Sequence, residues 1–188
     1  MRTAARNLAY AFAVGVVLLQ TAGATLIPRL SFEQLTDASD LIVSGRITNT
    51  WAAWDPEHKY IWTHYNVTVS TSLKGAPGGV VEFAEPGGAV EGYTMSIGGG
   101  VPYSVGDNLV VFLSRMPNGY LRTTGSAQGK YGLDERGRLH AQSSLGGDLV
   151  DAKIPPRGAS LQTLDGMSVT ELGQRISARV RATQGKVQ

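Results

Sequence analysis

The sequence predicts a mainly β domain, a small barrel or sandwich of short strands with one helix near each end. Three observations support this prediction. Short apolar or alternating segments recur along the chain, turn residues separate them, and helical apolar periodicity is confined to the two ends of the domain. Strands do not alternate with helices and no internal repeat is visible, which argues against a parallel α/β sheet.

The first 24 residues have the pattern of a secretory signal. Arg2 and Arg6 give a positive start, an apolar or small run covers residues 8–19, and Ala22-Gly23-Ala24 supplies the small residues of a cleavage site. The run has 12 residues, fewer than the ~20 needed to cross a bilayer. We therefore expect cleavage after Ala24 and export to the periplasm or the cell exterior. An uncleaved N-terminal anchor is the alternative.

Charge and cysteine content limit the chemistry. The chain has 17 basic and 15 acidic residues, and the excess lies in Arg2 and Arg6 of the signal. The pI near 9.0 is therefore no indication of nucleic-acid binding, because the remaining charges are balanced and interspersed. No cysteine is present, which excludes disulfides, thiol catalysis and cysteine-ligated metal centres. We expect no cofactor, no nucleic-acid partner and no stable membrane anchor after cleavage.

The expected division of the chain has four parts. Residues 1–24 form the signal peptide, 25–140 a β-barrel domain, 141–166 an irregular segment rich in Gly, Ser and Pro, and 167–183 a C-terminal amphipathic helix packing on the barrel. Two capping boxes mark helix starts, Ser31 with Gln34 and Ser168 with Glu171. The first of them predicts a short helix ending near residue 39.

The longest predicted strand covers residues 61–73 and alternates clearly. Its odd-numbered residues from Ile61 to Val69 form the apolar face, and Trp62 and His64 lie on the opposite face. A strand over residues 41–47 contains Gly45, which suggests a bend or bulge. Further strands are expected over residues 80–85, 90–97, 108–113, 120–124, 131–133 and 138–140.

A series of segments resembles exported bacterial proteins of unassigned function. The shared segments are ASDLIVSGRI (38–47), THYNVTV (63–69), LKG (73–75), PGG (86–88), VPY (101–103), GD (106–107), VFL (111–113) and QGKY (128–131). The arrangement is similar in shape to netrin and metalloproteinase-inhibitor domains, and it implies a small OB-like (Greek-key) β-barrel over residues 30–140. Those inhibitors reach a catalytic metal through an N-terminal cysteine. This chain has none, so that mechanism does not carry over.

Catalytic and phosphate-binding patterns are weak. Ser126 lies between glycines without the Gly-x-Ser-x-Gly spacing, and a turn explains it better. Gly98-Gly99-Gly100 lacks the Lys and helix start of a phosphate loop. The carboxylate pairs Asp134-Glu135 and Glu82/Glu85 are interpreted as solvated rather than catalytic.

A metal site is also disfavoured. Asp55, Glu57, His58 and His64 lie within ten residues, and these residue types suit zinc or harder ions. Six residues along a strand, however, separate His58 from His64 by ~20 Å. We therefore interpret the group as a charged loop beside a histidine, and no residue is assigned to a metal.

The aromatic residues are the best remaining indication of a site. All three tryptophans occur in one stretch of fourteen residues. An aromatic stripe on a barrel wall could stack a sugar or a peptide, and the alternative is a wall covered by a terminal helix or by residues 141–166. The candidate binding residues are Trp51, Trp54, Tyr60, Trp62 and His64, with Gly98, Gly99, Gly100 and Tyr103 of the following loop.

These observations predict an exported, non-enzymatic binding or interaction module. Its ligand would be an extracellular or envelope protein or an envelope glycan. A peptidase-associated inhibitor or accessory domain is the alternative, suggested by the barrel shape alone. A metal-dependent hydrolase is less favoured.

Overall fold

The computed structural model describes residues 27–97, 100–141, 149–150 and 164–185. The predicted signal peptide, residues 1–24, and most of the predicted irregular segment lie outside these ranges. Among the helices described, none combines the length and the apolar character needed to span a membrane.

A seven-stranded sheet dominates the structure, in the strand order β10-β9-β7-β2-β3-β4, with β8 paired to β7. Two small two-stranded sheets, β1-β11 and β5-β6, accompany it. The elements are β1 (Ile27–Pro28), α2 (Phe32–Ala38), β2 (Leu41–Trp54), β3 (Ile61–Lys74), β4 (Val80–Pro86), β5 (Gly88–Val90), β6 (Tyr93–Met95), β7 (Asn108–Arg115), β8 (Leu121–Thr123), the 3₁₀ turn η1 (Ser126–Gly129), β9 (Lys130–Leu133), β10 (Leu139–Ala141), β11 (Leu149–Val150) and α3 (Val169–Gln184).

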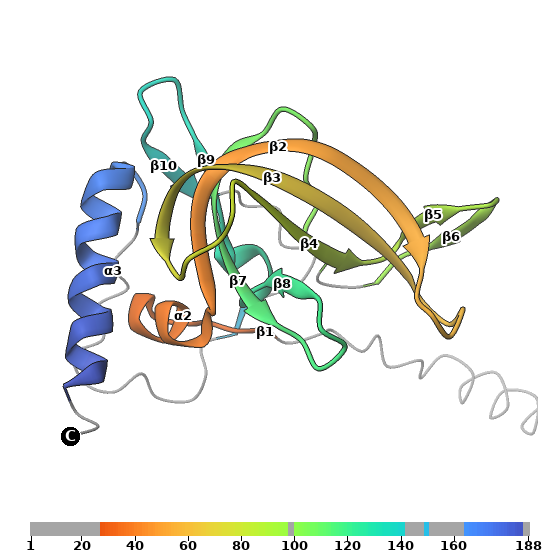
Figure 1. Ribbon diagram of the computed structural model, residues 1–188, viewed down its shortest axis with the longest axis horizontal. Helices are drawn as coiled ribbons and strands as arrows, with labels where there is room; N and C mark the ends of the chain where they lie inside the picture. Colours follow the sequence, from red (N-terminus) through yellow and green to blue (C-terminus); the bar gives the residue numbers. More distant parts are fainter. Residues whose placement is uncertain (1–26, 98–99, 142–148, 151–163, 186–188) are drawn as a thin grey trace, which may run out of the picture.

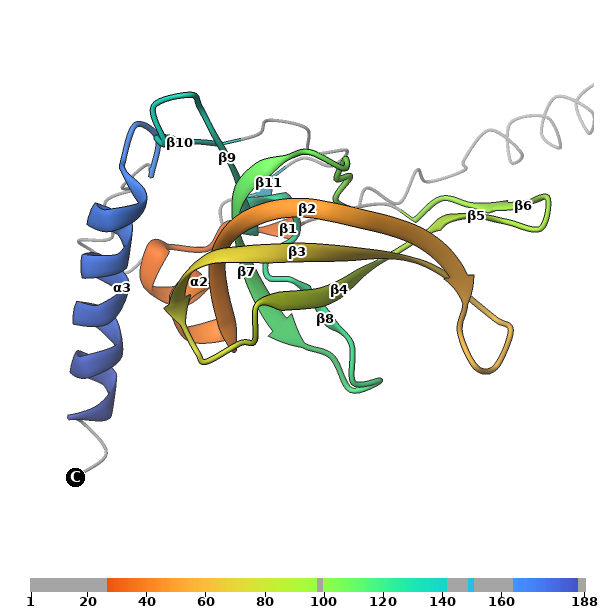
Figure 2. The same ribbon diagram turned by 45° about the horizontal axis from the view of Figure 1, so that its top comes forward.

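The sheet curves strongly but does not close. β2 and β3 arch over the molecule, and β4 returns toward β8 on the inner side (Figures 1 and 2). Within the described residues β4 pairs only with β3, so no backbone ladder joins β4 to β8. The mainly β class and the C-terminal helix are confirmed, whereas the predicted closed barrel is an open, curved sheet.

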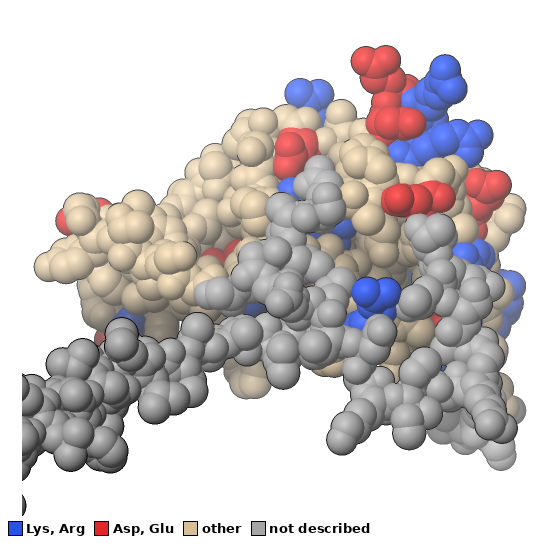
Figure 3. Space-filling model, turned by 180° about the vertical axis from the view of Figure 1, so that it is seen from behind, with Lys and Arg blue, Asp and Glu red and all other residues tan. Residues whose placement is uncertain are grey.

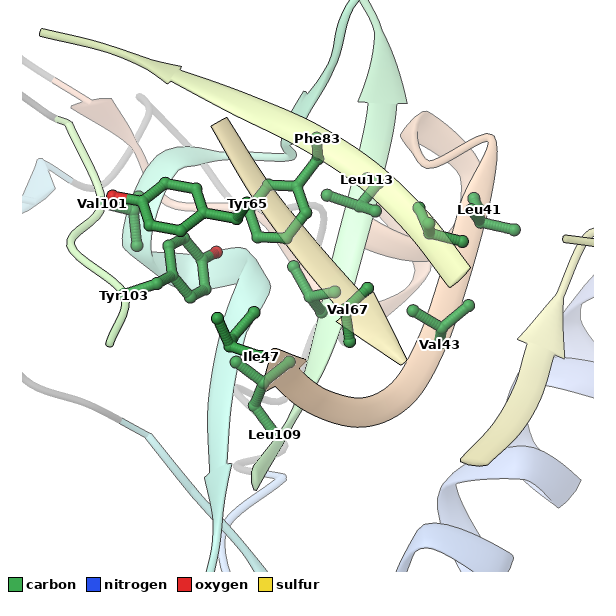
Figure 4. Packing of buried hydrophobic residues seen from close by; sticks show 12 residues of the cluster. Leu41, Val43, Ile47, Tyr65, Val67, Phe83, Val101, Tyr103, Leu109 and Leu113 are labelled. Carbon is green, nitrogen blue, oxygen red and sulfur yellow. The ribbon is translucent and has the colours of Figure 1, made fainter. Parts of the chain in front are cut away.

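Two cores lie on opposite faces of the sheet. Consecutive residues of β2 divide between them, because side chains alternate along a strand: Val43 belongs to the core inside the curve and Ile42 to the core under the helices. β7 divides in the same way, which explains its continuous apolar run. Figure 4 shows the inner core, with Tyr65, Phe83 and Tyr103 grouped at one end and Leu41 and Val43 at the other.

Both helices pack at one end of the sheet, as Figures 1 and 2 show. Both predicted capping boxes are formed, at Ser31 and at Ser168. Leu172 and Ile176 of α3 are fully buried in the outer core, and the predicted C-terminal helix is therefore confirmed. Asp37 of α2 pairs with Arg179 of α3 and joins the two helices.

Gly45 permits a sharp bend in β2. The register with β3 shifts between Ser44 and Gly45, which confirms the predicted irregularity. A Cβ atom at Gly45 would lie 2.2 Å from the Thr68 carbonyl oxygen, so only glycine fits this close approach.

Three features differ from the prediction. β2 continues to Trp54, because its second half pairs with β3 through the hairpin. The single strand expected over residues 90–97 is instead the β5-β6 hairpin, which turns at Glu91 and Gly92, both with positive φ. β1 and β11 form a parallel pair that no local pattern indicated.

Candidate functional site

The outer face of the β2-β3 hairpin brings Trp51, Trp62 and His64 together. Trp51 lies directly opposite His64 in the register, and Ala53 lies opposite Trp62. All four side chains therefore share one face, while Ile61, Tyr65 and Val67 are buried on the other face as the alternation predicts. The Trp51 and His64 rings stack with centroids 5.1 Å apart and planes 9° from parallel.

Tyr120 covers part of this face. It follows the turn between β7 and β8, and its ring meets Trp62 and His64 edge-on, with centroid separations of 5.3 Å and 5.2 Å. The four rings Trp51, His64, Tyr120 and Trp62 thus form one continuous group, which we call the aromatic row. The cover is provided by Tyr120, and not by the helices that the sequence interpretation considered for this role; those pack at the far end of β3.

Exposure is graded along the aromatic row. Trp51 is 36% exposed, and His64, beneath Trp51 and Tyr120, is only 7% exposed. Trp62 is half-buried, and its indole Nε1 has no hydrogen-bond partner in the described part of the chain. Trp51 therefore offers the most accessible ring of the row, and Trp62 a buried donor next to Tyr120.

His64 is fixed by a carboxylate. Its Nδ1 lies 2.9 Å from Glu82 Oε1, and the Glu82 side chain is 54% exposed. A histidine held between two rings and a carboxylate is a positioned side chain. Glu82 in turn presents its remaining acceptor capacity to solvent.

A groove lies next to the Tyr120 side chain. Its volume is about 310 Å³, and it separates β4 from the β7-β8 hairpin. Glu82 and Ala84 line one wall, and Arg115, Gly119 and Tyr120 line the other; the full lining is completed by Phe83 and Leu121. Because Tyr120 and Glu82 belong both to the groove and to the surroundings of His64, the aromatic row and the groove form one continuous surface.

Trp54 and Tyr60 do not join the aromatic row. Trp54 pairs with Ile61 and so points to the opposite face. There its ring centroid lies 5.6 Å from that of Tyr93 in β6 and 5.9 Å from that of His58. Tyr60 lies at the hairpin end, 42% exposed, with Lys59 Nζ 5.2 Å from its ring centre. The predicted aromatic cluster is therefore two groups on two faces.

The predicted binding loop, Gly98 to Tyr103, does not join the aromatic row either. Gly98 and Gly99 lie outside the described residues, and Gly100 is half-buried. Tyr103 is only 7% exposed and packs in the inner core against Tyr65 and Phe83. Its assignment to a binding surface is wrong, because its ring forms part of the core and its hydroxyl lies 2.6 Å from Thr123 Oγ1.

Glu85 also departs from the sequence interpretation. It is 3% exposed rather than solvated. Its carboxylate accepts hydrogen bonds from the Thr123 backbone N–H at 2.9 Å and from Arg122 Nε at 3.3 Å, across the opening between β4 and β8. Burial is the main cause that raises the pKa of Glu85, while the bonds from Thr123 and Arg122 lower it. A side chain therefore bridges the two strands that no ladder joins.

Sequence reasoning missed Tyr120, Arg115 and Glu82 as parts of the site. Tyr120 and Arg115 flank a β-turn at Asn118 and Gly119. The meeting of that turn with β4 depends on the curvature of the whole sheet, for which the local sequence carries no signal. The even spacing of Glu82 from Ala84 was the one available indication that both face outward.

Within the described residues, neither metal ligands nor surface charge indicate a second site. The described residues contain no group of three or more His, Cys, Asp or Glu residues placed to hold a metal ion. Figure 3 shows acidic and basic side chains mixed at the end that carries α3 and the β9-β10 hairpin. The opposite end, with the β5-β6 hairpin, has few charged side chains in that view, and Glu91 is the charged residue of that hairpin.

Comparisons with known proteins found no matching family model, no matching curated protein and no matching solved structure.

Proposed function

We propose that the chain is an exported, non-enzymatic binding module that recognises a protein or a cell-envelope glycan through its outer aromatic face. The observation that carries this proposal is the aromatic row, which runs from the exposed ring of Trp51 to Tyr120 and continues into the groove. Flat rings supply stacking area, and Glu82 and Arg115 supply a charged acceptor and donors beside them. Aromatic side chains with a few placed polar groups are the usual composition of a recognition site.

The strand directions support an OB-like relationship for the fold. Successive antiparallel pairings from β4 through β3, β2 and β7 to β8 make β4 and β8 run in the same direction. We infer an OB-like barrel whose last junction is bridged by the Glu85 carboxylate instead of a ladder. Export rests on the N-terminal pattern of Arg2, Arg6 and the apolar run.

Affinity capture with one altered ring tests the function. Residues 25–188 would be immobilised as wild type, as Trp51→Ala and as Tyr93→Ala, and exposed to the envelope and secreted fractions of the source cells. Tyr93 is 64% exposed on the β5-β6 hairpin and serves as a matched aromatic control. We expect a protein or glycan that wild type and Tyr93→Ala retain and Trp51→Ala loses. Equal retention by all three folded proteins would refute the aromatic face as the site.

A further inference from the structure

One face of the Trp51 indole is open. The other face is covered by the His64 imidazole, with the ring centroids 5.1 Å apart and the planes 9° from parallel. His64 lies on β3 directly opposite Trp51, so the covered face is turned toward β3. The open face is turned the other way, past the edge of β2. The 36% exposure of Trp51 therefore belongs mainly to a flat indole surface at the border of the sheet.

This border of β2 carries no neighbouring strand in the part of the chain that the structure describes. β7 pairs with β2 from Leu41 to Arg46, and the next contact is with residues 106–107, which bond to Ile47. Residues 49–54, which we call the β2 margin, pair with β3 alone. In Figure 1 this half of β2 forms the border of the arch.

The β2 margin presents main-chain donors and acceptors. Asp55 N–H donates to the Tyr60 carbonyl at 2.8 Å, and the register continues without a shift through residues 49–54. Bonded and non-bonded pairs alternate along an antiparallel ladder, so the odd-numbered residues of the margin bond to β3. The N–H and C=O groups of Thr50 and Ala52 therefore point away from β3, toward the side on which the indole is open.

Asn49 adds a side-chain amide to these groups. It is exposed and lies on the same face as Trp51, two residues or ~7 Å along the strand. Residues 47–54 contain no ionisable side chain, and Glu82, on β4, lies beyond His64 on the other side of the indole. The open indole face is thus bordered on β2 by neutral donors and acceptors.

A polypeptide partner fits the β2 margin poorly. An added strand would place every second side chain on the inner face of the sheet, where β5 crosses beneath β2. A Cβ atom at Gly88 of β5 would lie 3.2 Å from the Ala52 Cβ and 3.3 Å from the Ile61 Cγ2. A folded protein needs about 800 Å² with an apolar core, whereas Trp51 is the one exposed large apolar residue of the margin.

We propose that the open face of Trp51 and the β2 margin bind a neutral glycan, an extended chain of β-1,4-linked pyranoses with equatorial substituents. This inference rests on the proposed binding function and names its ligand class. Each such sugar presents a flat C–H face that stacks on an indole. Its hydroxyl groups then bond to the Asn49 amide and to the outward main-chain groups of Thr50 and Ala52.

Soluble hexasaccharides provide the probe. Chitohexaose and cellohexaose are neutral β-1,4-linked chains, and the glucosamine hexamer is a cationic control of the same length. Dissociation constants with residues 25–188 would be measured by isothermal titration calorimetry. We expect the neutral chains to bind more tightly than the cationic one, because the margin offers no charge partner. Trp51→Ala should weaken binding of the neutral chains at least about tenfold, since the stacking surface is lost.

A matched pair of asparagine variants locates the chain on the face. Asn66 lies directly opposite Asn49 in the register, but on the strand that carries His64. We expect Asn49→Ala to weaken binding about fivefold and Asn66→Ala to change it little. Amide hydrogen exchange gives a second readout, because a bound chain should slow exchange at Thr50 and Ala52. Circular dichroism confirms the fold of each variant.

Three outcomes overturn the proposal: neither neutral chain binds at millimolar concentration, Trp51→Ala binds them as well as wild type, or Asn66→Ala weakens binding as much as Asn49→Ala. If neither chain binds while affinity capture yields a protein that Trp51→Ala loses, the binding function stands and the glycan assignment fails. If Trp51→Ala changes neither the chains nor the captured ligand, both the glycan assignment and the aromatic face fail.

Discussion

The two halves of β2 belong to different environments. Residues 41–47 are buried on both faces, apart from Arg46, and lie between the two cores. Residues 48–54 are exposed or half-buried, and their outer face carries Trp51. One strand therefore serves stability in its first half and presents a surface in its second half.

The difference comes from what lies above the outer face. The first half has α2 and α3 packed over the sheet, so a change there disturbs two layers. Over the second half, Tyr120 of the β7-β8 hairpin is the cover found among the described residues, and Trp51 is 36% exposed. We therefore expect substitutions on the outer face of residues 48–54 to leave the fold intact.

Truncation in the outer core is the strongest way to test this division. Phe112 is fully buried under the helices. We expect Phe112→Ala to lower the free energy of unfolding by about 3–5 kcal/mol, through lost burial and a residual cavity. Trp51→Ala is expected to cost only about 1 kcal/mol, because one stacked contact is lost from a half-open face. Urea unfolding of both variants measures the difference, and equal losses would show that the aromatic row is structural.

Gly45 tests the bend that joins the two halves. Gly45→Ala places a methyl group against the Thr68 carbonyl, and the backbone must move to accommodate it. We expect a loss of about 1–3 kcal/mol in the free energy of unfolding. Arg46→Ala, at the next residue and exposed, is the control and should change little. An unchanged stability of Gly45→Ala would show that the bend does not depend on this contact.

The pH dependence of stability tests the role of Glu85, whose carboxylate bridges β4 and β8. Because burial raises its pKa in the folded protein above the ordinary value near 4.5, folding favours the protonated carboxyl. The stability that Glu85 contributes is therefore fully present below that ordinary value and is lost as the pH rises through the folded-state pKa. We expect the Tm of Glu85→Gln relative to wild type to increase with pH over this window. A constant difference from pH 4 to pH 8 would contradict the raised pKa.

The smallest expected effect concerns the helical end. The hydrogen bond from Arg179 holds the pKa of Asp37 below its ordinary value, and its charge acts in the same direction. Arg179→Ala should return the pKa of Asp37 toward the ordinary value, as carboxyl NMR titration can measure. Arg181→Ala, on the same exposed helix, is the control. No change in the Asp37 titration would mean that the pair does not form in solution.

Local patterns predicted most of the elements, because they depend on neighbouring residues. The alternation of β3 identified its buried face, and the capping boxes at Ser31 and Ser168 located both helix starts. Gly45 indicated its own irregularity. These features follow from side-chain spacing and backbone chemistry within a few residues.

The site was only partly predictable, because it depends on contacts between distant segments. Alternation placed Trp62 and His64 on one face, but it could not bring Tyr120 over them from more than fifty residues away. It also gave no reason to bury Tyr103 or Glu85, whose surroundings come from the curvature of the sheet. Trp54 does not belong to the aromatic row because it lies opposite Ile61 in the register, and side chains of paired residues point to the same face of a sheet.

The central claim is that ligand meets the outer aromatic face, and the three tryptophan indoles report on it directly. Trp51 and Trp62 belong to the aromatic row, whereas Trp54 lies on the opposite face and serves as an internal control. Their Nε1–H resonances would be followed in a ¹⁵N-labelled protein during titration with the captured protein or glycan. The account predicts shifts for Trp51 and Trp62 with Trp54 unchanged. Shifts confined to Trp54, or no shift in any indole while ligand binds, would contradict it.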